Sequence, residues 1–93
     1  MIEFYKEVAR YRADIEHARS GKMVDYSAIV YEGPNAGQFY IRHSHTTKAE
    51  GAAGPYFSNS FTMADSPEDA EHKIKAWCDS IANAYEVVVW PRD

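Results

Sequence analysis

The stretch that decides the predicted fold is "DSPEDAEHKIKAWCDSIANAY", residues 65–85. Ser66 is placed to cap a helix, Pro67 suits the first helical position, and Asp69 completes a Ser-x-x-Asp capping box. Apolar residues then recur at alternating spacings of four and three: Ala70, Ile74, Trp77, Ile81 and Ala84. This stretch therefore predicts an amphipathic helix that packs one side on a core.

The flanking segments change to the period of two that is typical of strands. After the helix, "EVVVW" (86–90) is rich in β-branched residues and predicts a last strand. Before it, apolar and polar residues alternate in three segments, 24–31, 39–45 and 56–63. The first two are separated by the turn "EGPNAGQ" (32–38), and residues 46–55 predict a flexible loop before the third.

The first twenty residues favour a second helix. Five apolar residues in this region also recur at spacings of four and three: Phe4, Val8, Tyr11, Ile15 and Ala18. The pattern predicts a helix over residues 3–20 that Gly21 ends.

Together these elements predict a single α+β domain over residues 1–93, with the order α-β-β-β-α-β. We expect a two-layer sandwich in which two helices cover one face of a four-stranded, mostly antiparallel sheet. A right-handed crossover through the second helix would return the last strand parallel to the first and beside it.

Composition and charge exclude several classes of function. Fourteen acidic against ten basic residues give a net charge of −4, and no cluster of cations is visible, which argues against direct nucleic-acid binding. The charged N-terminal segment shows no signal peptide or membrane span, and the single cysteine, Cys78, fits a reducing compartment. A cytoplasmic protein without a membrane partner is predicted.

His43 and His45 are the first candidates for chemistry, because residues two apart on a strand project to the same side. Two ligands do not complete a zinc site. His17, His72 and Glu50 could in principle converge on them, but no spacing matches a known ligand pattern, so the favoured interpretation is a structural role at the end of a strand or in capping a loop. Cys78 is interpreted as a buried, inert thiol. The sequence thus predicts no catalytic residues, no metal and no cofactor.

A recognition surface is the more informative candidate. Alternation places Tyr31, Tyr40, Arg42 and Tyr56 on the outward face of the sheet, and tyrosine and arginine are enriched where proteins bind each other. The alternative is that these tyrosines are simply good strand formers. The acidic start of the 65–85 helix adds three further partner-binding candidates: Glu68, Asp69 and Glu71.

Two partial resemblances bear on function. The predicted α-β-β-β-α order over residues 3–85, with "GPNAGQF" (33–39), resembles the double-stranded-RNA-binding domain. In that family lysines open the last helix, whereas this chain has "SPEDAEHK", so RNA binding through the usual surface is not expected. The layout of residues 24–90, with "ADSPEDAEHKI" (64–74), is similar to that of the HicB-type antitoxin domain.

The small size, acidity and layout also resemble phage and mobile-element proteins of the anti-CRISPR type. That resemblance implies a non-enzymatic inhibitor that binds a protein, for example within a nucleic-acid-handling host complex. The alternatives are a divergent nucleic-acid-binding or HicB-like antitoxin domain, and a small enzyme centred on His43 and His45. A homodimer is left open.

Overall fold

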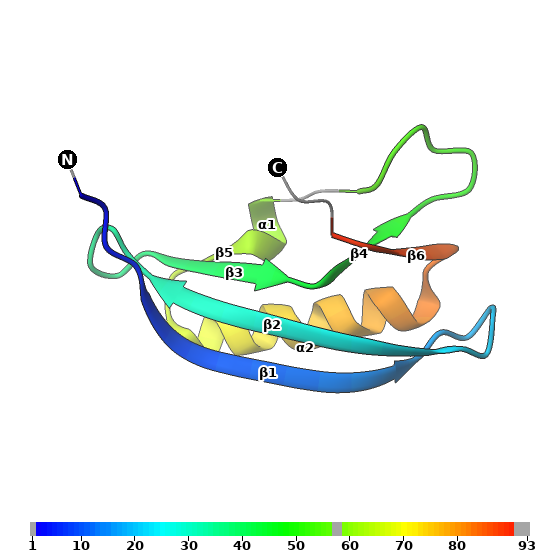
Figure 1. The fold of residues 1–93 in the computed structure, drawn as a ribbon, viewed down its shortest axis with the longest axis horizontal. Coiled ribbons are helices and arrows are strands. Elements are labelled where there is room, and N and C mark those ends of the chain that lie inside the picture. The colour runs from blue at the N-terminus through cyan, green and yellow to red at the C-terminus, as the bar shows by residue number, and fades with distance from the viewer. Residues whose placement is uncertain (1, 57–58, 91–93) are drawn as a thin grey trace.

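The computed structural model describes residues 2–56 and 59–90. Four strands form one antiparallel sheet in the order β1-β2-β3-β5: β1 (Lys6–Glu16), β2 (Met23–Glu32), β3 (Phe39–His43) and β5 (Met63–Ala64). The helix α2 (Pro67–Asn83) runs along one side of this sheet (Figure 1). The predicted α+β class and four-stranded antiparallel sheet are therefore confirmed.

The predicted helix over residues 3–20 is wrong, because this region forms the longest strand, β1. The side chains of β1 alternate: Ala9, Tyr11, Ala13 and Ile15 lie against the core, whereas Arg10, Arg12, Asp14 and Glu16 are exposed. Tyr11 and Ile15 satisfy both a helical and a strand period, so the apolar pattern alone did not decide between them. Pairing with β2 decides it, and Gly21, at φ +71°, lies in the hairpin turn between the two strands.

The predicted second strand, 39–45, is broken at Ser44 into β3 and β4 (His45–Lys48). Ser44 donates its backbone N–H to Ser27 on β2 and accepts one from Trp90, so the chain passes there from one sheet to another. The last strand, β6 (Glu86–Val89), is observed where predicted but pairs antiparallel with β4. Its predicted parallel position beside the first strand is wrong.

The predicted third strand, 56–63, is also wrong in its extent. The single-turn helix α1 (Asn59–Thr62) precedes the two-residue strand β5, and residues 57 and 58 lie outside the described residues. Polar residues with local hydrogen-bonding capacity fill this segment, and they compete with a strand ladder. The predicted pair of helices on one face is thus reduced to one long helix and one turn.

The helix α2 forms as its capping residues predict. The Ser66 side chain accepts the Asp69 N–H at 3.0 Å, and Pro67 occupies the first turn. Its buried side, Ala70, Ile74, Trp77 and Ile81, packs on the inward residues of the sheet, among them Tyr26, Ala28, Val30 and Ile41. Since side chains alternate along a strand, the intervening sheet residues face away from α2.

Candidate protein-binding surface

We call the side of the four-stranded sheet opposite α2 the open face. It consists of Arg10, Arg12, Asp14, Asp25, Ser27, Ile29, Tyr31, Tyr40, Arg42 and Met63. Tyr31 and Tyr40 lie directly opposite each other on β2 and β3, and Arg42 lies opposite Ile29. The structure therefore brings together three of the predicted partner-binding residues.

An aromatic cluster marks one end of the open face. Tyr5, which precedes β1, meets Tyr40 edge-to-face with ring centroids 6.2 Å apart, and Tyr40 in turn neighbours Tyr31. Tyr5 is 52% exposed and the paired Met63 42% exposed. Rings of this kind offer large, rigid contact area at low entropic cost.

A hollow of about 420 Å³ marks the other end of the open face. Its lining residues come from both sheets: Ser27, Ile29, Arg42, His43, Ser44, His45, Val89 and Trp90. Arg42 is exposed and makes no ion pair among the described residues, and Val89 on the same rim is 71% exposed. A guanidinium between apolar side chains suits a partner that presents a carboxylate beside an apolar group.

The other cations of the open face are already paired. Arg10 forms an ion pair with Glu7, and Arg12 with Asp25 at 2.7 Å. Both line a second, smaller hollow of about 290 Å³ that shares Ser27 and Ile29 with the first. Arg42 is consequently the cation of this face that a partner can reach without displacing an internal carboxylate.

His43 has a structural role in the core. It is 3% exposed, and its Nδ1 and Nε2 lie 2.5 Å from the Tyr26 hydroxyl and 2.6 Å from the Phe61 carbonyl oxygen. The carbonyl can only accept, so Nε2 carries the proton and the Tyr26 hydroxyl donates to Nδ1. Burial lowers the pKa of His43, which therefore stays neutral.

The alternation predicted that His43 and His45 project to the same side, and this prediction is wrong. The bend at Ser44 shifts the alternation of inward and outward side chains by one residue. Thr46, not His45, turns into the core. The Ser44 hydroxyl accepts the Ser27 N–H at 2.9 Å and lies 2.7 Å from His45 Nδ1. Burial lowers the pKa of His45 as well.

The Ser44 hydroxyl and His45 Nδ1 are as close to each other as a nucleophile and its general base would be. A working pair also needs a third group that orients the base, and no described residue bonds the other ring nitrogen of His45. His17, near the turn after β1, bonds Ser20 and the Ala84 carbonyl at the end of α2. Within residues 2–56 and 59–90, no three side chains form a metal-binding group.

Tyr56 does not lie on the open face. It follows the loop after β4 and stacks on Trp77 of α2, with ring centroids 6.2 Å apart and an angle of 22°. Its predicted place on the sheet depended on a strand that does not form.

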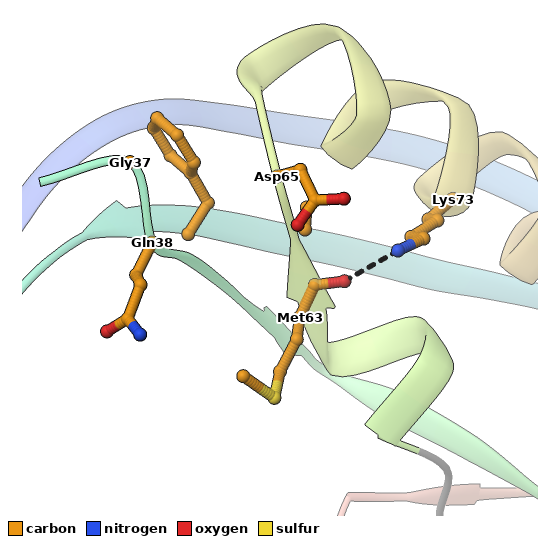
Figure 2. Close-up of a pocket in the computed structure, with 7 residues that line it drawn as sticks. Gly37, Gln38, Met63, Asp65 and Lys73 are labelled. Carbon is orange, nitrogen blue, oxygen red and sulfur yellow. Dashed lines mark hydrogen bonds between the residues drawn. The ribbon is translucent and has the colours of Figure 1, made fainter. Parts of the chain in front are cut away.

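The carboxylates at the start of α2 do not belong to the open face, because α2 packs on the other side of the sheet. Asp69 accepts the Asp65 N–H and pairs with Lys73 at 3.1 Å, and these contacts lower its pKa. Lys73 also donates to the Met63 carbonyl beside a hollow of about 220 Å³, with Asp65 next to it (Figure 2). Lys73 thus links α2 to β5, and Asp69 holds Lys73 in place, while Glu68 and Glu71 are exposed.

Several residues on the open face or at its two ends were not among the predicted partner-binding residues: Tyr5, Arg10, Arg12, His45, Val89 and Trp90. The sequence contains a signal for two of them: Arg10 and Arg12 alternate with Ala9, Tyr11 and Ala13, which is the period of a strand with one exposed face. His45, Val89 and Trp90 reach the face only through the non-local pairing of β4 with β6.

No protein-family model, curated protein or solved structure matches the chain. Among the described residues, no helix is both long enough and apolar enough to cross a bilayer. The function is therefore argued from the surface itself.

Proposed function

We propose that the chain is a non-enzymatic protein-binding module that docks a protein partner on its open face. The observation that carries this proposal is Arg42, an exposed guanidinium without an ion pair among the described residues, on the rim of a hollow with Ile29 and Val89. The partner presents a carboxylate to Arg42 and apolar groups to the hollow and to the Tyr31–Tyr40 end of the face.

The histidines support a binding role over catalysis. His43 and His17 are held by hydrogen bonds to Tyr26, Ser20 and backbone carbonyls, and no buried side-chain nitrogen or oxygen of the described residues lacks a partner. Inhibition of a nucleic-acid-handling host complex, as by phage-encoded inhibitors of the anti-CRISPR type, is the biological role that we propose for such a module.

A second candidate is a single-strand nucleic-acid binder, because Tyr31, Tyr40 and Arg42 share one face, as in proteins that stack bases and hold phosphates. Pairing of Arg10 and Arg12 with internal carboxylates and the net charge of −4 make it the weaker candidate. Titration of labelled oligonucleotides at low salt separates the two: binding in the micromolar range would favour the second.

The test of the first proposal is capture from an extract of cells that naturally contain the chain. The wild type should retain a protein in stoichiometric amount, and Tyr40→Ala with Arg42→Ala should lose it, with binding weakened by at least about 2 kcal/mol. The matched control is Lys75→Ala on α2, an exposed cation that should bind normally. Equal capture by the open-face variant, with its fold verified by circular dichroism, would remove the proposal.

A further inference from the structure

The strand β1 is an exposed edge of the sheet. It is the outermost strand in the order β1-β2-β3-β5, and none of the described residues pairs with its outer side (Figure 1). Every second residue of such an edge directs an N–H and a C=O group away from the sheet, which is a template for another strand.

The edge is regular over most of its length. The one irregularity in its pairing with β2 lies between Glu7 and Ala9, and from Ala9 to Glu16 the register runs without a break. Bulges protect edges where they occur, so the unprotected part of β1 is this C-terminal stretch.

We infer that this stretch pairs antiparallel with β1 of a second copy of the chain, with Ala13 on the two-fold axis. Arg12 then lies opposite Asp14 of the second copy, and Arg10 lies opposite Glu16 of the second copy. On the side that faces α2, Tyr11 lies opposite Ile15 of the second copy. The sequence of β1 is therefore complementary to itself in both charge and apolar character.

Other registers that keep the two open faces on one side lack this match. A shift of the axis to Arg12 or to Asp14 places like charges directly opposite each other. A shift to Tyr11 places Arg10 opposite Arg12 of the second copy. The charges thus select one register, in which every charged pair over residues 10–16 is attractive.

A second, independent observation points to the same contact. Within one chain Asp14 lies directly opposite Asp25, and like charges in this position destabilise a sheet. Arg12 is engaged by Asp25, and Asp14 makes no ion pair among the described residues. Only one nitrogen of Arg12 contacts Asp25, and a guanidinium has five N–H donors, so Arg12 of the second copy can keep its own Asp25 and still supply the cation that Asp14 lacks. The two open faces then become one continuous surface.

Two variants of opposite sign test the inference by native mass spectrometry and sedimentation. The acidic variant carries Arg10→Glu with Arg12→Glu, and the basic variant carries Asp14→Lys with Glu16→Lys. Each should self-associate about tenfold or more weakly than the wild type, whereas an equimolar mixture should form heterodimers. Lys48→Glu with Lys75→Glu, the same charge change on β4 and α2 rather than at the edge of β1, should dimerise normally.

A disulfide test checks the register without charge changes. Directly opposite residues of antiparallel strands have Cα atoms about 4.5–5.5 Å apart, within the range of a disulfide. Ala13→Cys should therefore form a covalent dimer on mild oxidation, and Arg10→Cys should not.

Three results would overturn the inference. The first is a wild-type chain that stays monomeric at about 0.5 mM, where even a dimer with a Kd of about 0.1 mM is mostly paired. The second is an acidic variant that associates as tightly as the wild type, and the third is an Arg10→Cys dimer that forms as readily as the Ala13→Cys dimer.

Discussion

Replacement of Tyr26 by Phe should destabilise the protein through one hydrogen bond. Tyr26 is fully buried, and its hydroxyl donates to Nδ1 of His43, which is itself 3% exposed. Burial raises the pKa of Tyr26, so the hydroxyl keeps its proton and remains a donor. Tyr26→Phe preserves the ring and its packing but leaves a ring nitrogen in the core without a partner.

The magnitude follows from that orphaned acceptor. A buried polar group that loses its only partner costs about 1–3 kcal/mol, and water has no access at this depth. For a domain of this size, each kcal/mol corresponds to a fall in Tm of about 4–8 °C. The free energy of unfolding should be measured by urea titration monitored by circular dichroism, with the Tm from the same samples.

Tyr11→Phe is the matched control. Tyr11 is half-buried on β1, and its hydroxyl makes no hydrogen bond with the described residues, so we expect a change within about 0.5 kcal/mol. Equal stability of the two variants would refute the assignment of His43 as a structural residue and would reopen it as a site of chemistry.

Three further predictions concern stability. Folding lowers the pKa of His43 and of His45, so the unfolded chain takes up protons first as the pH falls. The free energy of unfolding should therefore decrease from about pH 6.5 downward. A free energy of unfolding that stays constant between about pH 7.5 and 5.5 would contradict this. Ser66→Ala removes the hydroxyl that accepts the Asp69 N–H and should lower the free energy of unfolding, measured in urea, by about 1 kcal/mol. Ser80→Ala is the control and should have no effect, because its hydroxyl bonds within the helix. Gly33→Ala should lower the free energy of unfolding by about 1–3 kcal/mol, because φ is +124° and a Cβ would lie 2.5 Å from the Phe4 carbonyl oxygen. In Gly37→Ala the added Cβ meets no atom within 4 Å, so this control should lose less stability when both variants are compared by thermal unfolding.

The parts of the fold that the sequence predicted are those with local causes. The helix α2 is specified by Ser66, Pro67 and Asp69 at its start and by an apolar side of its own, so no distant partner is needed to recognise it. The strand β2 shows an equally clear alternation over 24–31.

The parts that were missed depend on non-local pairing. Tyr11 and Ile15 fit a helix and a strand equally well, and only the partner strand β2 resolves the ambiguity. The break at Ser44 is set by hydrogen bonds to Ser27 and Trp90, which lie 17 and 46 residues away in the chain. The same break separates His43 from His45 and builds the hollow beside Arg42, so the residues that β4, β6 and Trp90 add to this hollow were not predictable from local patterns.

The central claim, that a protein partner occupies the open face, is tested most directly by hydroxyl-radical footprinting of the wild-type chain with and without its captured partner. The tyrosines serve as built-in probes, because Tyr31 and Tyr40 lie on the open face, whereas Tyr56 packs on Trp77 and Tyr85 follows α2. The account predicts that the partner reduces oxidation of Tyr31 and Tyr40 and leaves Tyr56 and Tyr85 unchanged. Protection of Tyr56 and Tyr85 with unchanged oxidation of Tyr31 and Tyr40 would contradict it and move the interface to the side of α2.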